Sequence, residues 1–240
     1  NITFDGTKSY DPDGGIVNYT WNFQDGTTSN NALDQHGFVQ DGVYIVSLLV
    51  TDNDGATDSD SVKVTVLNQR PTAFFPDITA GTYESISLNG SYCSDLDGYI
   101  ANFTWDIGGG VFRYGPEVFT NWSHRGYYEV RLTISDDDGA PASTSFNVTI
   151  NNAPPRAFFY FEPSKPTETE VVTFNASTST DIDGTITNYT WNFGDGAAGY
   201  GMIAQHAYLT NGSYWTVLII TDNDGSSANV TRLKRLTRAR

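Results

Sequence analysis

Asn188-Tyr189-Thr190-Trp191-Asn192-Phe193 is the stretch that decides the fold, because two earlier stretches of the chain follow the same pattern. They are Asn18-Tyr19-Thr20-Trp21-Asn22-Phe23 and Asn102-Phe103-Thr104-Trp105-Asp106-Ile107. Apolar and polar residues alternate in each, which is the period of a strand with one face in a core and the other in water. Each tryptophan is therefore expected to face inward, and the asparagine three residues earlier to face outward.

The tryptophans mark a repeat of almost constant length. Trp21, Trp105 and Trp191 lie 84 and 86 residues apart. Two acidic motifs recur at the same offsets, an Asp-x-Asp-Gly before the tryptophan and an Asp-x-Asp-Gly after a second apolar stretch. Similarity at a fixed period indicates an array of equal units. The expected domains are residues 1–68, 69–152 and 153–240, called here the first, second and third repeats.

Each repeat shows about seven short alternating segments separated by turn residues, and no helical period. In the third repeat we expect strands over residues 157–161, 171–174, 188–193 and 214–221, followed by a last strand after the second acidic loop. This spacing predicts an all-β fold of three tandem immunoglobulin-like β-sandwiches. The links at 68–71 and 151–156 are short and contain proline, so the domains are expected to form a rod.

The first repeat lacks the segment that forms the first strand in the other two. Asn1 aligns with Val171, so the counterpart of residues 157–161 is absent. An uncovered sheet edge favours pairing with another chain, and proteins normally cover it. Two explanations stay open: the domain was cut from a longer array, or a partner donates a strand to it.

The charge distribution argues against nucleic-acid binding by the body of the chain. The formal net charge is −15, and five of the 13 basic residues fall in the last nine positions. The remaining surface is strongly acidic and would repel phosphate backbones. No apolar run reaches the roughly 18 residues of a membrane-spanning helix, so the chain is not expected to span a membrane.

Taken together, the motifs of the third repeat resemble those of the PKD domain, named for polycystic kidney disease. Trp191-Asn192-Phe193-Gly194-Asp195-Gly196 is followed in order by Gln205-His206-Ala207-Tyr208, Gly212-Ser213-Tyr214 and Thr221-Asp222-Asn223-Asp224-Gly225. The second repeat departs from the pattern with Ile107-Gly108-Gly109-Gly110 and with Thr120 in place of the histidine. The resemblance implies an extracellular β-sandwich that serves as a spacer or interaction module, as in archaeal surface-layer proteins and secreted polymer-degrading enzymes. It does not imply catalysis.

The two acidic loops of each repeat are the best candidate metal ligands. In an immunoglobulin-like sandwich these loops emerge at the same end, which faces the preceding domain. Four clustered carboxylates repel each other, and Ca²⁺ would relieve this with its tolerant oxygen coordination. The alternative is turn chemistry, with aspartates bonded to backbone amides and glycines at positive φ. The candidate ligands are Asp11, Asp13, Asp52, Asp54, Asp95, Asp97, Asp136, Asp138, Asp181, Asp183, Asp222 and Asp224.

Ten Asn-x-Ser/Thr sequons suggest N-linked glycans as the second kind of modification or ligand. Several fall on alternating segments where the asparagine faces outward. The alternative is that Asn and Thr simply suit exposed strand faces. The candidate sites are Asn1, Asn18, Asn89, Asn102, Asn121, Asn147, Asn175, Asn188, Asn211 and Asn229.

The basic residues Arg232, Lys234, Arg235, Arg238 and Arg240 form a candidate interface. One hypothesis is an electrostatic clasp onto the acidic end of another subunit, and the alternative is a frayed chain end. Tyr44, Tyr128 and Tyr214 are expected to be core or corner tyrosines, and His36 and His206 to make structural hydrogen bonds. No nucleophile with a base and an orienting acid recurs among the repeats, so no catalytic residues are predicted.

These patterns lead to one main functional hypothesis and one alternative. The main hypothesis is an extracellular, glycosylated structural protein, a surface-layer, filament or stalk component that contacts copies of itself or neighbouring surface proteins. The alternative is a non-catalytic accessory array of a secreted hydrolase that binds an insoluble polymer. The alternative requires exposed aromatic residues, and Trp122 and Trp215 are the tryptophans outside the repeated strand that could provide them.

Overall fold

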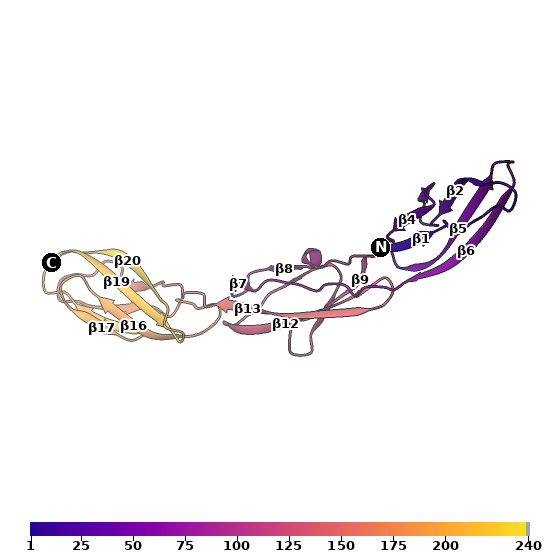
Figure 1. Cartoon of the computed structure of the whole chain (residues 1–240). Helices are drawn as coiled ribbons and strands as arrows, with labels where there is room; N and C mark the ends of the chain where they lie inside the picture. Colours follow the sequence, from indigo (N-terminus) through magenta and orange to yellow (C-terminus); the bar gives the residue numbers. More distant parts are fainter. Residues whose placement is uncertain (239–240) are drawn as a thin grey trace. The chain divides into compact units, whose positions relative to one another are not determined.

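The computed structural model describes residues 1–238, in which strands β1 to β20 and one short 3₁₀ helix make up the regular structure (Figure 1). No α-helix occurs within this range. The prediction of an all-β fold with three tandem immunoglobulin-like sandwiches is confirmed. The rod-like arrangement of the three stays a prediction.

The described chain divides into two compact units, and the division runs through the second repeat. One unit contains residues 1–76, 89–118 and 130–146. The other contains residues 77–88 and 119–129 and the described chain from residue 147 onwards. Both units thus include strands of the second repeat together with one complete neighbour.

The first repeat contains a four-stranded sheet and a two-stranded sheet. The larger sheet has the order β3-β2-β5-β6, and the smaller pairs β1 with β4. The strands are β1 (Ile2–Asp5), β2 (Ile16–Asn22), β3 (Thr28–Ser29), β4 (Leu33–His36), β5 (Gly42–Asp52) and β6 (Thr57–Val66).

The second repeat has a five-stranded sheet of order β10-β9-β12-β13-β7 and a pair, β11-β8. Here β7 runs parallel to β13, with Ile78 opposite Val148. The elements are β7 (Ile78–Gly81), β8 (Ile86–Asn89), a 3₁₀ helix (Gly90–Tyr92), β9 (Ile100–Asp106), β10 (Phe112–Tyr114), β11 (Glu117–Thr120), β12 (Gly126–Asp136) and β13 (Pro141–Asn151).

The third repeat packs a three-stranded sheet, β14-β15-β18, against a four-stranded sheet, β17-β16-β19-β20. In Figure 1, β16, β19 and β20 lie side by side at the orange to yellow end of the chain. The strands are β14 (Tyr160–Glu162), β15 (Val171–Asn175), β16 (Ile186–Asn192), β17 (Ala198–Tyr200), β18 (Ile203–Ala207), β19 (Gly212–Asp222) and β20 (Ser227–Leu236).

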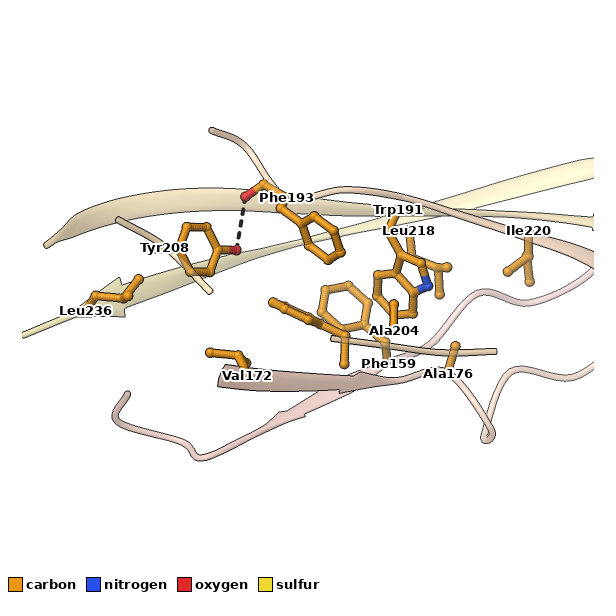
Figure 2. Packing of buried hydrophobic residues seen from close by; sticks show 11 residues of the cluster. Phe159, Val172, Ala176, Trp191, Phe193, Ala204, Tyr208, Leu218, Ile220 and Leu236 are labelled. Carbon is orange, nitrogen blue, oxygen red and sulfur yellow. Dashed lines mark hydrogen bonds between the residues drawn. The ribbon is translucent and has the colours of Figure 1, made fainter. Parts of the chain in front are cut away.

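The repeated tryptophans lie in the cores, as their alternation predicts. Trp105 and Trp191 are 0% exposed and Trp21 is 6% exposed. Each indole N–H donates to a backbone carbonyl ten residues further on, those of Asn31, Gly115 and Gly201. In the third repeat, Figure 2 shows Trp191 packed among Phe159, Phe193, Leu218 and Ala204, with the Tyr208 hydroxyl bonded to the Phe193 carbonyl. Each tryptophan thus combines a large buried surface with a satisfied polar atom.

The first strand of the second and third repeats differs from its prediction. In the third repeat only Tyr160–Glu162 is a strand, preceded by a single bridge between Arg156 and Thr180. In the second, Thr72 bridges Ser94, and residues 73–75 form no strand. Pro76 follows directly and has no N–H to donate, which limits pairing there. Sequence reasoning also missed β7.

The glycine-rich segment of the second repeat forms the same kind of hairpin as the others. β9 and β10 pair in antiparallel register, with Phe112 opposite Asp106. Gly108, Gly109 and Gly110 all have positive φ, between 62° and 88°. That backbone is accessible to glycine at little cost, so the three glycines replace the Gly-Asp-Gly turn of the third repeat.

Candidate functional site: the acidic loops and the linkers

The two acidic loops of each repeat are bonded to each other, as their predicted placement at one end of the sandwich requires. In the third repeat the Asn223 side-chain oxygen accepts from the Thr185 N–H at 2.6 Å, and the Asn223 N–H donates to the Thr185 carbonyl at 2.9 Å. Asn53 with Gly15 and Asp137 with Tyr99 make the same pair of bonds. The residue between the two later aspartates is therefore what joins the loops.

The glycines of the two loops have different roles. Gly55, Gly139 and Gly225 end the later loop with φ of 87° to 88°, as turn chemistry predicts. Gly184 in the earlier loop is needed for space, because a Cβ there would lie 2.2 Å from the Asn223 side-chain oxygen. A larger residue at this position would push the two loops apart.

The first aspartate of the later loop organises its turn. Asp222 Oδ1 accepts from the N–H groups of Asp224 and Ser226, at 2.9 and 2.8 Å. Asp52 makes the equivalent bonds to Asp54 and Ala56. The turn role proposed as the alternative for these aspartates is confirmed.

In the second and third repeats, the other oxygen of this aspartate accepts a hydrogen bond from the linker that leads into the repeat. Asn152 Nδ2 donates to Asp222 Oδ2 at 2.8 Å, and the Ala153 N–H donates to Asp183 Oδ2 at 3.0 Å. The second repeat has the same clamp. There Asn68 donates to Asp136 at 3.1 Å, and the Gln69 N–H donates to Asp97 at 2.8 Å. Two charge-assisted hydrogen bonds thus fix each linker to the domain that follows.

Sequence reasoning missed Asn68 and Asn152 as functional residues. The signal was present, because both asparagines open a proline-containing linker and stand 84 residues apart, as the tryptophans of their repeats do. What the sequence cannot provide is the direction of the side chain. Only the fold shows that each amide reaches a carboxylate 68 or 70 residues later in the chain.

Burial and hydrogen bonding move the pKa values of these aspartates in opposite directions. Burial raises the pKa of Asp11, Asp95 and Asp181, and neighbouring aspartates add to the effect. Burial alone would also raise the pKa of Asp136 and Asp222, but hydrogen bonds from Asn68, Asn152 and backbone amides hold it below the usual value. Asp136 and Asp222 therefore lose their charge at a lower pH than Asp11, Asp95 and Asp181 do.

The second joint has an ion pair that the first lacks. Arg125 of the second repeat lies against Asp224 of the third, with Nε 2.5 Å from Oδ1. Asp41 occupies the position equivalent to Arg125 in the first repeat. The pKa of Asp138 is raised, mainly by burial and to a smaller extent by the charge of Asp41. The first joint therefore brings two like charges together where the second brings opposite charges together.

The geometry of the acidic loops does not add support to the calcium hypothesis. Across residues 1–238, no three His, Cys, Asp or Glu side chains are grouped so that they could hold a metal ion. Several carboxylate oxygens are buried without a hydrogen-bond partner, among them both oxygens of Asp95 and one of Asp97. Calcium binding at the acidic loops stays a prediction, and no step below depends on it.

Replacing Asn152 with alanine should destabilise the third repeat by about 1–3 kcal/mol, because it leaves a buried carboxylate with fewer donors. Asp222 is 2% exposed and loses its contact with the amide. The free energy of unfolding is measured by chemical denaturation, with hydrogen exchange of the β19 and β20 amides as the readout for the third repeat. Asn151→Ala is the matched control, since Asn151 is exposed. Equal stability of the two variants would contradict a clamp at Asn152.

Eight of the ten sequon asparagines are exposed, and two are half-buried. Asn89 and Asn175 are the half-buried pair, and each accepts from the N–H two residues later. Asn175 also donates to the Tyr160 hydroxyl at 2.9 Å, which engages the nitrogen that a glycan would need. The structure thus makes these two the least accessible candidates, and glycosylation itself stays a prediction.

The alternative of a frayed chain end is wrong for the first three of the basic residues, and the clasp onto another subunit stays a prediction for the exposed ones. Arg232, Lys234 and Arg235 belong to β20, which pairs with β19. Lys234 is 1% exposed, so it cannot contact another subunit. Arg235 and Arg238 are exposed; Arg240 lies outside the described residues.

The two candidate aromatic residues have opposite environments. Trp122 is 9% exposed and packs on Tyr128 at a centroid distance of 5.3 Å, so the expectation that it is available for binding is wrong. Trp215 is 60% exposed. Trp122 lies two residues after the end of β11, outside any strand, so no alternation in the sequence indicates its burial.

The structural roles expected for the tyrosines and histidines are confirmed. Tyr44, Tyr128 and Tyr214 each donate to the carbonyl four residues earlier, at 2.9 to 3.0 Å. His36 and His206 each bind the aspartate of the preceding turn, at 2.6 and 2.7 Å, and stack on a core phenylalanine. These residues fix the sandwich and are not candidate ligands.

Comparison with known proteins gives relatives that are much longer than this chain. This chain is 31% identical over 144 residues to the pre-pro-metalloprotease PrtV of Vibrio cholerae, and the match covers 59% of this chain and 15% of the relative. It is 46% identical over 70 residues to the collagenase ColA of Clostridium perfringens, covering 29% and 6%. Among solved structures, the PKD1 domain of Vibrio anguillarum Epp is 27% identical with a TM-score of 0.34, covering 37% of this chain and 100% of that domain.

The family comparison accounts for nearly the whole sequence. The model of the PKD domain matches residues 1–66, 68–150 and 152–237 in tandem. No helix in residues 1–238 is both long enough and apolar enough to cross a bilayer. The chain belongs to the PKD domain family.

Proposed function

We propose that this chain is a non-catalytic accessory array of a secreted protein, and that its third repeat binds an insoluble polymer. The observation that carries the proposal is an exposed aromatic face on the sheet β17-β16-β19-β20. The relatives that are a metalloprotease and a collagenase support the accessory role. This replaces the surface-layer or filament hypothesis as the preferred one, since the metalloprotease and collagenase relatives fit an accessory array better.

The face follows from the strand register. Trp191 pairs with Leu218 and points into the core. The adjacent row, Tyr200, Thr190, Ile219 and Asn229, therefore points outward. Trp215 lies four residues from Ile219 on the same strand, and so on the same face. Tyr200, Ile219 and Trp215 are 74%, 44% and 60% exposed, and together they extend over roughly 15 Å.

Such a face suits a polymer with repeated flat or apolar surfaces. Aromatic side chains bury a large area at low conformational cost, and Trp and Tyr dominate binding hot spots. The other repeats offer less: Trp215 is replaced by Ile45 in the first and by Glu129 in the second. The third repeat is therefore the one assigned to polymer contact, with the clamped linkers holding the joints between repeats.

Replacing Trp215 with alanine is expected to weaken polymer binding by about tenfold or more, the loss typical of an exposed anchor. The assay is a pull-down of the whole chain on insoluble collagen, chitin and cellulose. Leu209→Ala is the control, because Leu209 is 85% exposed but lies between β18 and β19. Binding to none of the three polymers, or equal binding by the two variants, would contradict the proposal.

A glycosylated stalk contacting copies of itself or neighbouring surface proteins is the second candidate. The eight exposed sequons favour it. The two candidates conflict at one place, because Asn229 is directly opposite Ile219 on the outward face. A glycan found at Asn229 in the native protein would cover that face and favour the stalk, whereas an unmodified Asn229 leaves the face open to a polymer.

A further inference from the structure

A polar cavity of 470 Å³ lies at the end of the second repeat, beside the linker that leads into the third. Its volume is within the range of roughly 300–1,000 Å³ that is usual for ligand sites. The lining comes from the region where β12 begins, the region where β13 ends, and the linker. The side chains that offer contacts are Arg125, Tyr127, Thr149, Asn151 and Asn152. None of them belongs to the aromatic face of the third repeat.

Three of these side chains lie on the outward face of the sheet. Val130 on β12 and Ile150 on β13 are buried in the core. Because side chains alternate along a strand, Tyr127, Thr149 and Asn151 point away from the core. Tyr127 is 86% exposed, more than any other aromatic side chain in residues 1–238. Its ring is therefore available to a ligand.

Arg125 supplies hydrogen-bond donors whose direction is fixed. Its Nε binds Asp224 of the third repeat, which orients the planar guanidinium and leaves the hydrogens on its two terminal nitrogens for another acceptor. The same ion pair cancels the charge of the arginine, on a chain with a formal net charge of −15. An anionic ligand would thus be repelled, whereas a neutral ligand with hydroxyl groups would not.

The linker adds an acceptor that lacks a donor. Asn152 Nδ2 donates to Asp222 and to Ser226. The side-chain oxygen of Asn152 is buried and has no hydrogen-bond partner within the described chain. An unsatisfied buried acceptor costs free energy. A ligand hydroxyl that donates to this oxygen would remove that cost.

The cavity does not offer an open strand edge to a peptide. β13 pairs with β12 on one side and with β7 on the other, and Thr149 is opposite Thr79 of β7. The backbone groups of the lining strand are therefore engaged in the sheet, whereas strand addition needs them to be free. What a ligand meets here is a set of donor and acceptor side chains around one aromatic ring.

We propose that this cavity binds a neutral carbohydrate, a short stretch of a polysaccharide, with the ring of Tyr127 against the apolar face of a sugar. Arg125 donates to sugar oxygens. The polar side chains of Thr149, Asn151 and Asn152 exchange hydrogen bonds with sugar hydroxyls, each of which is both a donor and an acceptor. The inference rests on the proposed function in one respect, since the sugar would belong to the polymer that the third repeat contacts.

The first joint provides an internal comparison. Asp41 and Val43 of the first repeat occupy the positions of Arg125 and Tyr127. The first joint thus lacks both the fixed donors and the ring. One such site per chain is therefore expected.

The test is a titration of the whole chain with cellotetraose and, separately, with chitotetraose, followed by heteronuclear NMR. Trp215→Ala is introduced first, so that the anchor proposed for the third repeat does not contribute. At least one of the two sugars should shift the amide signals of residues 125–127 and 149–152. Tyr127→Ala should weaken this binding roughly tenfold or more, the loss of a central aromatic contact. Tyr114→Ala is the matched control, since Tyr114 is a 72% exposed tyrosine of the same repeat outside the cavity.

The inference is overturned if neither sugar shifts these amides, or if the two tyrosine variants bind equally. It is also overturned if tetragalacturonate or a peptide of repeated Gly-Pro-Pro binds there more tightly than either neutral sugar, since the ligand would then be an anion or a protein. The pull-down on insoluble polymers separates these results from the proposed function. Polymer binding that depends on Trp215, with no sugar at the cavity, would leave the role of the third repeat intact. Sugar binding at the cavity without polymer binding by the third repeat would leave the cavity intact.

Discussion

Replacing Lys234 with methionine is expected to raise the free energy of unfolding of the third repeat by about 1–4 kcal/mol at pH 6, the range seen when buried charges give way to apolar residues. Lys234 is 1% exposed, and its amine has no hydrogen-bond partner. Three aromatic rings surround it, with Phe161 and Phe174 at 4.6 and 4.7 Å. Contacts with the rings compensate only part of the lost hydration.

The effect should depend on pH in a defined direction. Burial lowers the pKa of Lys234 from 10.5 to about 7, with the charge of Glu170 acting in the opposite sense. Between these values the unfolded chain holds the proton and the folded chain does not. Stability should therefore rise with pH, by at most about 1.4 kcal/mol per unit from this residue. Below about pH 7 the amine is charged in both states, so the penalty of burying the charge is greatest there.

Native-state hydrogen exchange at β19 and β20, measured from pH 6 to pH 9, tests both statements. The gain from Lys234→Met should shrink as the pH rises. Lys63→Met is the control, since Lys63 is exposed on β6. The equivalent positions Val64 and Val148 are buried valines, so an apolar residue is compatible with this place in the sandwich. A gain that is independent of pH, or equal for the two variants, would contradict a charged amine in the core.

Replacing Phe159 with alanine should cost the third repeat about 3–5 kcal/mol, the usual loss for a buried phenylalanine. Phe159 is fully buried and contacts Trp191 and Phe174. The variant would leave a cavity beside Trp191 in the core of the third repeat.

Urea denaturation followed by intrinsic fluorescence and by exchange at β16 gives the measurement. Phe158→Ala is the control. Its ring is 43% exposed and lies under the Arg232 guanidinium at 4.4 Å, so we expect a loss of less than about 1 kcal/mol. Similar losses for Phe158 and Phe159 would show that the inner position has no special role.

Much of the fold could be predicted because each local signal agreed with the others. The alternation around Trp191 predicts a half-buried strand, and its recurrence near Trp21 and Trp105 predicts the number of domains. The acidic loops were also placed correctly at one end of each sandwich. A fold can be predicted from its sequence when the local patterns and the global fold agree in this way.

The errors concern side chains whose environment depends on distant residues. A strand of alternating residues would put Lys234 inside, but the charge suggested a solvated tail, and the aromatic residues that receive it come from β14, β15 and the segment after β18. Trp122 is hidden by contact with Tyr128. The clamp at Asn152 needs an aspartate 70 residues away. Periodicity reports which face a residue is on, and it does not report which partner it meets there.

The linker clamps suit an order of folding that follows the order of synthesis. Asn68 and Asn152 precede the carboxylates that hold them, so during synthesis each amide emerges before the loops to which it binds. Domains in such arrays fold as units in the order of their synthesis. Each new sandwich can therefore close onto a linker that is already present, and its last loop completes the joint. The chain is thus suited to being built from the first repeat towards the third, one joint at a time.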